Sequence, residues 1–322
     1  MQKTILITGG AGFIGFFVAK ELLARGDKVI IVDNINDYYD PQLKLDRLKE
    51  LKKHPQANNL QIEKVDIAEY GELEKIFKNN KIDKVFNSAA QAGVRYSLEN
   101  PFSYQRTNLL GFLNILELMR HYEIKDLVYA SSSSVYGANT KTPFSEQDKT
   151  DKPVSLYAAT KKSNELLAYS YHHLFGINAT GLRFFTVYGP WSRPDMAMLK
   201  FALKMAKGEE IDIYNEGKMK RDFTYIDDIV QGVVRAIDKS YPFEVFNLAY
   251  GQTVELLRYV DALEKALGIE AKKNMMPMQA GDVKQTDADI SKAKKMLNFN
   301  PHTSVEEGVG KFAEWFKEYY KM

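Results

Sequence analysis

The sequence predicts an α/β protein: a doubly wound parallel sheet followed by a smaller C-terminal α+β lobe. Short β-branched runs alternate with longer amphipathic segments through the first 185 residues, which is typical of a parallel sheet covered by helices. A glycine-rich turn follows the first of these runs. Beyond residue 185, prolines and glycines interrupt the alternation. We therefore expect a dinucleotide-binding domain over 1–185 and a substrate-binding lobe over 186–322, with the chain crossing back to the core.

The N-terminal domain contains five runs that we expect to form buried strands. They are TILIT (4–8), KVIIVD (28–33), LQIEKVD (60–66), DKVFNSA (83–89) and DLVYASSS (126–133). A further helix and strand pair is expected over 156–185. Between the second and third runs, the charged segment QLKLDRLKELKK (42–53) predicts an additional helix with a solvated surface.

The C-terminal part mixes short strands with helices. EIDIYN (210–215), EVFNLA (244–249) and TDADIS (286–291) are expected as strands, and VELLRYVDALEKAL (254–267) as a helix. This mixture suits a smaller lobe that closes over a ligand.

Composition excludes several classes of protein. Hydrophobic residues make up 45% and charged residues 27%, so a packed core is expected rather than disorder. The 44 basic and 42 acidic side chains are scattered and leave a net charge of +2, which indicates neither a nucleic-acid nor a membrane partner. Cysteine is absent, which excludes disulfides and thiolate metal sites, and we expect no metal. With no secretory or transmembrane segment evident, the expectation is a soluble cytoplasmic protein.

The glycine-rich turn predicts a dinucleotide site of the Rossmann type. Thr8-Gly9-Gly10-Ala11-Gly12-Phe13-Ile14-Gly15 follows the first strand and opens a helix, so bare backbone can approach a pyrophosphate at the helix N-terminus. Asp33 ends the second strand, where a carboxylate can bind a ribose 2′-hydroxyl and repel a 2′-phosphate, which favours NAD over NADP. Asp66, at the end of the third strand, could bind adenine or could serve as a turn residue.

A tyrosine and a lysine are spaced for acid–base chemistry. Tyr157 and Lys161 lie four residues apart on an expected helix, hence on one face. The serines 131–134 end the fifth strand, at the edge of the sheet where ligands bind. A phenol with a reference pKa of about 10 needs a nearby cation to act as a base near neutrality, and Lys161 could supply it. A serine hydroxyl would orient the alcohol that is oxidised.

Together, these segments resemble the extended short-chain dehydrogenase/reductase family along nearly the whole chain. The resemblance is carried by TGGAGFIG (8–15), SSSSVYG (131–137), the Tyr157/Lys161 pair, LRFF (182–185) and RDF (221–223). It implies a catalytic set of Tyr157, Lys161 and Ser132, although the serine could be displaced by one or two positions. It also implies a nucleoside diphosphate sugar as substrate and a homodimer formed through the helical stretches 97–122 and 156–175.

The resemblance extends to individual binding residues. Those implied for NAD are Gly9, Gly12, Phe13, Ile14, Gly15, Asp33, Asn34, Asp66, Ile67, Ala89, Ala90, Gln91, Asn108, Tyr157 and Lys161. Those implied for the sugar nucleotide are Arg95, Ser133, Ser134, Thr186, Arg193, Arg221 and Asp282. Arg221 and Asp282 are expected at the diphosphate and uridine ribose, and Arg193 at a carboxylate on the sugar.

Within the family, the serine segment favours epimerisation. Dehydratase and decarboxylase branches carry an acidic residue beside the serine or threonine, whereas residues 132–137 here are SSSVYG. Segments 36–39, 89–97 and 188–197 look like the UDP-glucuronate 4-epimerases, with departures at Ser192 and Ala280, where glycine and proline are usual. UDP-glucose and N-acetylated sugars remain alternative substrates. A dehydratase, a decarboxylase or a non-catalytic NAD(P) sensor is disfavoured, the sensor because both Tyr157 and Lys161 are present.

Overall fold

A computed structural model describes residues 2–278 and 285–322. Its centre is a seven-stranded sheet in the order β11-β6-β5-β4-β1-β2-β3, in which all neighbouring strands are parallel. The strands are β1 (Thr4–Thr8), β2 (Lys28–Val32), β3 (Leu60–Glu63), β4 (Lys84–Asn87), β5 (Asp126–Ser132), β6 (Asn178–Phe184) and β11 (Phe243–Leu248). The chain winds outward from β1 to β3 and then returns to β4 on the other side of β1. That reversal leaves a crevice at the carboxyl ends of β1 and β4, where ligands bind in open α/β sheets.

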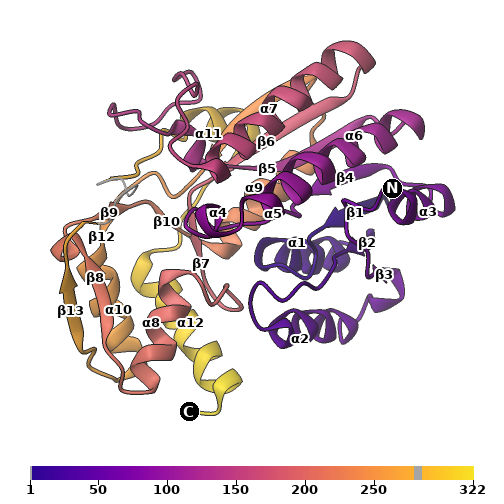
Figure 1. Ribbon diagram of the computed structural model, residues 1–322. Coiled ribbons are helices and arrows are strands. Elements are labelled where there is room, and N and C mark those ends of the chain that lie inside the picture. The colour runs from indigo at the N-terminus through magenta and orange to yellow at the C-terminus, as the bar shows by residue number, and fades with distance from the viewer. Residues whose placement is uncertain (1, 279–284) are drawn as a thin grey trace.

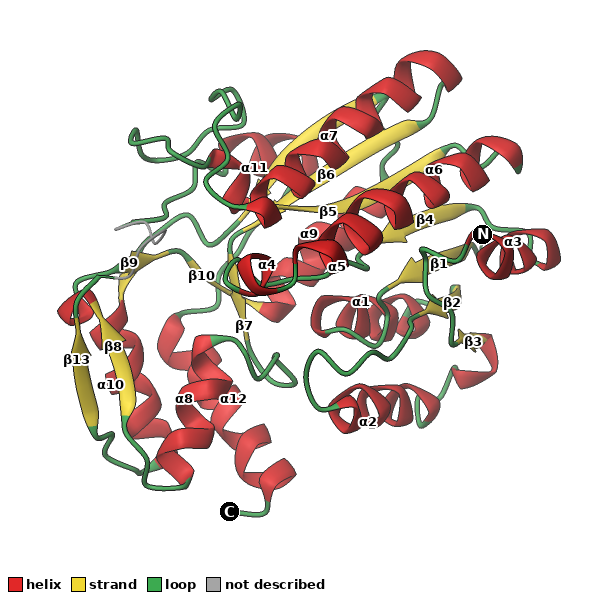
Figure 2. Ribbon diagram, in the orientation of Figure 1, coloured by secondary structure: helices red, strands yellow, loops and turns green. Residues whose placement is uncertain are grey.

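Helices cover both faces of this sheet (Figure 2). One face is covered by α3 (Tyr70–Asn79), α6 (Phe112–His121) and α7 (Leu156–Phe175), and the other by α1 (Phe13–Ala24), α2 (Pro41–Lys52) and α9 (Ile226–Asp238). The buried hydrophobic side chains form one cluster on each face of the sheet. The five expected N-terminal strands and the expected helix over 156–175 are confirmed.

The stretch over 97–122 is helical but segmented. It comprises α4 (Tyr96–Glu99), α5 (Pro101–Tyr104), a π-helical segment η2 (Gln105–Gly111) and α6. Pro101 begins α5, where Asn100 caps the Ser103 N–H at 3.3 Å. A proline is tolerated only in the first turn of a helix, which is why the chain breaks and restarts there.

The C-terminal lobe is built from short strand pairs and helices (Figure 1). Its strands are β7 (Thr186–Tyr188), β8 (Ile211–Tyr214), β9 (Lys220–Arg221), β10 (Phe223–Tyr225), β12 (Val254–Glu255) and β13 (Lys273–Met276). Its helices are α8 (Ala197–Ala206), α10 (Leu256–Leu267) and α12 (Val305–Tyr320), while α11 (Ser291–Leu297) packs near β11. Two 3-10 turns, η1 (Ala57–Asn59) and η4 (Asn215–Gly217), complete the connections, and η3 (Ser133–Tyr136) follows β5.

Two expectations for the C-terminal half need correction or refinement. The run 244–249 forms β11 at the edge of the central sheet beside β6, so it is the expected crossing back to the core. The run 286–291 does not form a strand, and within the described residues this region makes only the isolated bridges of Ala288 with Phe144 and Gln285 with Lys220. Each bridge pairs a single residue with its neighbour, so the consecutive hydrogen-bonded pairs of a β-strand do not form.

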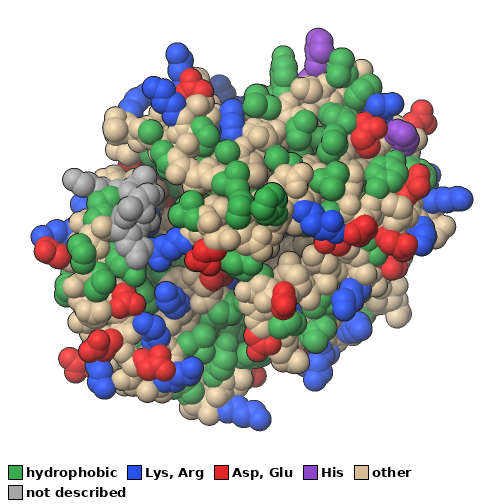
Figure 3. All heavy atoms as spheres, in the orientation of Figure 1, with side chains coloured by type: hydrophobic (Ala, Val, Ile, Leu, Met, Phe, Trp, Pro, Cys, Tyr) green, Lys and Arg blue, Asp and Glu red, His purple; other side chains and the backbone are tan. Residues whose placement is uncertain are grey.

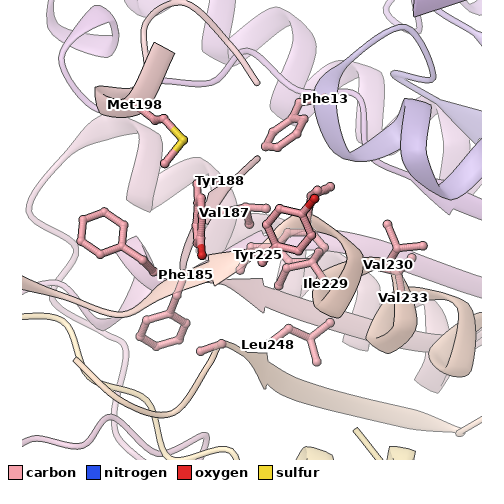
Figure 4. Packing of buried hydrophobic residues seen from close by; sticks show 14 of the residues in the cluster. Phe13, Phe185, Val187, Tyr188, Met198, Tyr225, Ile229, Val230, Val233 and Leu248 are labelled. Carbon is pink, nitrogen blue, oxygen red and sulfur yellow. The ribbon is translucent and has the colours of Figure 1, made fainter. Parts of the chain in front are cut away.

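One apolar core joins the two parts of the molecule. Figure 4 shows Phe13 from α1, Tyr188 from β7, Tyr225 from β10 and Leu248 from β11 packed in one region. Burial of such side chains contributes about 1.5–3 kcal/mol each. The lobe is therefore attached to the sheet by shared packing, which holds the loops of both parts around the crevice.

The charged helix α2 does not have the fully solvated surface that was expected. Lys44 and Arg47 are buried, at 5% and 0% exposure. Both lie on the face that carries Leu43, Leu48 and Leu51, because residues three and four apart share a side of a helix. Long basic side chains on that face can be buried when their donors find acceptors, and here they reach backbone carbonyls.

Candidate active site

The glycine turn between β1 and α1 presents bare backbone to the crevice. Gly9 has a φ of +69°, and a Cβ on it would lie 2.7 Å from the Ala89 nitrogen. A Cβ on Gly12 or Gly15 would lie 2.9 Å or 2.3 Å from the Gly9 carbonyl oxygen. Side chains are therefore excluded from this turn, and the N-terminus of α1 remains open to an anionic group.

A cavity of about 410 Å³ runs from this turn to Tyr157. It is lined by most of the residues that were expected to bind ligands. Of these, the lining includes Gly9, Gly12, Phe13, Ile14, Asp33, Asn34, Asp66, Ile67, Ala89, Ala90, Gln91, Ser132, Ser133, Ser134, Tyr157, Lys161, Thr186 and Arg193. The fold thus brings the expected cofactor residues and the expected catalytic residues into one continuous space.

Asp33 lies at the end of β2 and lines this cavity. Its carboxylate accepts hydrogen bonds from the Ala11 N–H at 3.1 Å and the Ile35 N–H at 2.9 Å, so it also fixes the glycine turn. Burial raises its pKa, against the effect of those bonds and of the charges of Lys44 and Arg47. Each carboxylate oxygen has a second lone pair that can accept from a ribose hydroxyl.

Asp66 has a turn role that the structure shows directly. Its Oδ1 accepts from the Ala68 N–H at 2.9 Å, while Oδ2 accepts from the Asn34 amide at 3.3 Å. The next residue, Ile67, is buried, and its carbonyl accepts from Asn114 at 2.9 Å. Both residues line the cavity, so a contact between Asp66 and a ligand remains a proposal alongside the turn role.

Asn108 is buried on η2 and is not among the residues that line the cavity. Its Oδ1 accepts from the Gln91 N–H at 2.8 Å, and its Nδ2 donates to the Gln91 carbonyl at 3.1 Å and to the Thr160 hydroxyl at 3.0 Å. The side chain connects the loop after β4 to α7. Asn108 therefore positions cavity-lining residues rather than facing the cavity itself.

Ser131 and Ser132, which are neighbours in the serine cluster, have side chains that point in opposite directions. The Ser131 hydroxyl donates to Glu165 at 2.8 Å, and Glu165 forms a buried ion pair with Arg183. Ser132 points the other way, because side chains alternate along a strand. Its hydroxyl donates to the Ser134 hydroxyl at 3.1 Å, and it lowers the pKa of the nearby Tyr157 phenol. Among the three serines left open by the sequence, Ser132 is the one whose side chain affects the pKa of Tyr157.

Tyr157 and Lys161 lie on the first turns of α7, but not as a simple pair. The Lys161 ammonium donates to the Ala130 carbonyl at 2.8 Å, and burial lowers its pKa to about 8. The pKa of the Tyr157 phenol is raised by burial, which outweighs the opposing effects of Ser132 and of the charge of Arg193. In this structure Lys161 donates to a backbone carbonyl, and its expected role in favouring the phenolate stays a prediction.

Arg193 lines the cavity and is held by an acid that the sequence reasoning missed. Its Nε and Nη2 donate to the two oxygens of Asp195 at 2.9 and 2.7 Å. Asp195 also accepts from the Tyr38 hydroxyl at 3.2 Å. The motif that contains both residues was recognised, but a partner two positions away cannot be distinguished from a solvated acid without the loop's conformation.

The remaining expected substrate residues lie around the lobe. Thr186 begins β7 and lines the cavity. Arg95 precedes α4 and stacks on the Tyr214 ring of the C-terminal lobe, 5.2 Å from its centroid. Arg221 lies in β9, and its Nη1 donates to the Lys220 carbonyl at 3.0 Å. Ala280 and Asp282 lie outside the described residues.

Arg47 is the second residue that the sequence reasoning missed. Its guanidinium donates to the Ala11 carbonyl of the glycine turn and to the carbonyls of Trp191 and Ser192, next to Arg193. Helical periodicity could have found it, because Arg47 is four residues from both Leu43 and Leu51 on the apolar side of α2. Ser192, where glycine is usual, is buried beside it.

Two negative findings apply to the described residues only. Within 2–278 and 285–322, no group of three or more histidine, cysteine, aspartate or glutamate side chains could hold a metal ion. No helix in the same residues has the length and apolar character needed to cross a bilayer.

Comparison with known proteins identifies the family. A family model described as GDP-mannose 4,6 dehydratase matches residues 6–312. The chain belongs to this family, that of the extended short-chain dehydrogenases/reductases. Its relatives within this family include UDP-glucuronate 4-epimerase 4 of Arabidopsis thaliana, which is 47% identical over 98% of this chain and 76% of the relative.

Other members of the extended short-chain dehydrogenase/reductase family match over the full length. UDP-glucuronate 4-epimerase of Thermodesulfobacterium geofontis is 46% identical over 97% of this chain and 96% of the relative. A crystal structure of UDP-glucuronic acid 4-epimerase from Bacillus cereus, in complex with UDP-glucuronic acid and NAD, superposes with a TM-score of 0.90. It is 35% identical and covers 98% of this chain and 100% of its own.

Proposed function

We propose that this protein is an NAD-dependent 4-epimerase of UDP-sugars, and that it converts UDP-glucuronate to UDP-galacturonate. The observation that carries the proposal is that one cavity is lined by the glycine turn, by Tyr157 together with Ser132, and by Arg193. The glycine turn suits a dinucleotide, Tyr157 and Ser132 suit the alcohol that reacts, and Arg193 suits a carboxylate on the sugar. The full-length similarity to UDP-glucuronate 4-epimerases supports the same activity.

The residues present fit NAD. The backbone cradle at Gly9 and Gly12 leaves no room for a side chain, which suits a pyrophosphate. Asp33 offers free lone pairs at the end of β2, where the adenosine ribose lies in this fold. We expect Lys161 to hold the nicotinamide ribose and Ala89 to Gln91 to border the nicotinamide. When bound, NAD⁺ supplies a hydride acceptor that also returns the hydride.

The chain's own residues would move the proton. Tyr157 takes the proton of the sugar 4-hydroxyl as the hydride leaves C4, which produces a 4-keto sugar. Ser132, which lines the cavity together with Tyr157, would orient the oxygen at C4. After the keto sugar rotates about its diphosphate link, the hydride returns to the other face and Tyr157 gives the proton back. Protons and hydride are conserved, so the product is the C4 epimer.

The serine segment favours this reaction over dehydration. A dehydratase must remove and deliver additional protons, and the segment 132–137 contains no acid beside Ser132. Although the family model is described by a dehydratase, this catalytic segment has the groups that an epimerase needs and lacks the group that a dehydratase adds.

Glucuronate is the proposed sugar because of Arg193. A carboxylate in a closed site requires a cation or several donors. Arg193 lines the cavity with Thr186, Ser133 and Ser134. UDP-glucose, or an N-acetylated UDP-sugar, would use the same Tyr157 chemistry and is the alternative substrate.

A homodimer is part of the proposal. Exposed apolar side chains gather along α4 to α7, a region where Figure 3 shows several hydrophobic side chains at the surface. They are Leu98, Phe102, Leu110, Leu113, Leu166, Tyr169 and Leu174, of which Phe102 is 81% exposed. Exposed apolar side chains gathered on neighbouring helices are typical of a protein–protein interface, and we infer that they form one here. We also infer that the enzyme works in the cytoplasm.

A panel of UDP-sugars tests the function. Purified protein would be incubated with UDP-glucuronate, UDP-glucose and UDP-N-acetylglucosamine, and the C4 epimers resolved by chromatography. We expect UDP-galacturonate from UDP-glucuronate with the highest kcat/KM and no net NADH. A dehydrated or decarboxylated product, or conversion of none of the three sugars, would contradict the proposal.

A further inference from the structure

The loop before α8 contains a charge pair, of which only Arg193 has a role in the function proposed above. Arg193 and Asp195 form a two-pronged ion pair along the Nε–Nη2 edge of the guanidinium, at 2.9 and 2.7 Å. The two side chains are 23% and 30% exposed, so the pair is partly screened from solvent. A planar guanidinium held by two hydrogen bonds has a defined orientation, whereas one held by a single hydrogen bond can rotate.

Asp195 is held from the opposite part of the chain. The Tyr38 hydroxyl donates to its Oδ2 at 3.2 Å, and the Tyr38 ring packs on Tyr96 with centroids 4.8 Å apart. Tyr38 follows β2 in the N-terminal domain, whereas Asp195 belongs to the C-terminal part. Asp195 is therefore held by Tyr38 while it accepts two hydrogen bonds from Arg193.

The pair leaves one edge of Arg193 available. A guanidinium has five N–H donors, and the bonds to Asp195 use Nε and Nη2. In the part of the chain that the structure describes, no residue accepts a hydrogen bond from Nη1 of Arg193. The side chain lines the cavity together with Tyr157 and Thr186. A second carboxylate can therefore bind along the Nη1 edge of the guanidinium while Asp195 remains bonded to the Nε–Nη2 edge.

Asp195 stays charged in this position. Burial opposes its ionisation, but the charge and hydrogen bonds of Arg193 lower its pKa. Asp195 therefore remains a charged acceptor that holds the guanidinium of Arg193 at two points.

We propose that Asp195 is a positioning residue for sugar selectivity, which holds Arg193 by one edge so that its other edge receives the carboxylate of the sugar. The inference rests on the proposed function and adds to it the residue through which Arg193 acts. It requires that Asp195 matter for a uronate and not for a neutral sugar, because only the uronate uses the oriented edge.

The test compares Asp195→Asn with a matched control, Asp212→Asn. Asp212 pairs with Lys204 at 3.2 Å in the same lobe, and its side chain has the same 30% exposure. kcat and KM would be measured for UDP-glucuronate and UDP-glucose, with melting temperatures as a check on folding. We expect Asp195→Asn to lower kcat/KM for UDP-glucuronate about tenfold through KM, and to change UDP-glucose less than about twofold. Asp212→Asn should leave both unchanged.

A double-mutant cycle separates positioning from an independent contact. If Asp195 acts through Arg193, then Arg193→Ala combined with Asp195→Asn should lose no more UDP-glucuronate activity than Arg193→Ala alone. Asp195→Glu retains the charge and should recover part of the selectivity, which also covers the case in which the Asn variant folds poorly. Additive losses in the cycle would overturn the inference.

The outcomes distinguish this inference from the proposed function. If the wild type epimerises UDP-glucuronate and Asp195→Asn leaves the ratio of kcat/KM for the two sugars unchanged, the function stands and the inference is wrong. A ratio that shifts toward UDP-glucuronate would also overturn it, because Asp195 would then be competing with the sugar carboxylate. If the wild type converts UDP-glucose but not UDP-glucuronate, both the substrate assignment and the inference are wrong.

Discussion

Arg47 donates two hydrogen bonds to the carbonyl of Trp191, at 3.2 and 2.7 Å, although the residues are 144 positions apart. The same guanidinium donates to the Ala11 carbonyl and to the Tyr39 hydroxyl, both at 2.8 Å. One buried side chain thus ties the glycine turn to the loop that contains Arg193. It joins the expected cofactor end of the cavity to the expected sugar end through one side chain.

Removing Arg47 should therefore destabilise the fold and loosen both sites. In Arg47→Met, the buried Ala11 carbonyl would lose its partner, so we expect the free energy of unfolding to fall by about 2 kcal/mol or more. KM should rise for the sugar and the affinity for NAD should fall. Urea unfolding and NAD titration measure these effects, with Lys49→Met as control, because Lys49 is exposed on the same helix. Equal stability of the two variants would show that the Arg47 network contributes nothing.

Tyr157→Phe should remove the acid–base group while leaving the fold intact. Turnover is expected to fall by roughly 10²- to 10⁴-fold. The melting temperature and the amount of bound NAD should stay near those of the wild type. Tyr70→Phe, at the start of α3 and outside the cavity lining, serves as the control and should retain full turnover. A Tyr157→Phe enzyme with wild-type turnover would place the base elsewhere.

Lys161 should make stability depend on pH. Its folded-state pKa of about 8 lies below the ordinary value of 10.5, because burial disfavours the ammonium. Between these values the unfolded chain binds more protons, so the stability of the wild type should rise as pH rises through this window. From pH 7.5 to 9.5, the wild type should gain about 2 kcal/mol relative to Lys161→Met. Urea titrations of both proteins at the two pH values measure the difference, and parallel pH profiles would rule out a lowered Lys161 pKa.

Phe102 should contribute to the proposed dimer. Phe102→Glu places a charge within the proposed apolar interface, and we expect it to weaken association by about 2 kcal/mol or more. Light scattering after gel filtration at several concentrations would measure the oligomeric state. The control is Val154→Glu, because Val154 is 52% exposed but lies in the loop before α7. A monomeric wild type, or a Phe102→Glu protein that dimerises normally, would refute this use of the α4–α7 surface.

The sequence by itself determined the features that depend on near neighbours in the chain. The glycine turn, the position of Asp33 at the end of β2 and the four-residue spacing of Tyr157 and Lys161 all follow from short-range geometry. Periodicity was enough to predict the five N-terminal strands and α7, since a strand or helix that buries one side repeats its apolar residues at a fixed interval.

Only the tertiary structure decided which groups meet. It turned Ser132 toward Tyr157 and Ser131 toward Glu165, it set Asp195 against Arg193, and it buried Arg47 against residues far along the chain. It also placed β11 in the central sheet and Asn108 behind the cavity wall. These outcomes depend on contacts between distant segments, and a polar side chain takes a buried position only when such a segment supplies its hydrogen-bond partner.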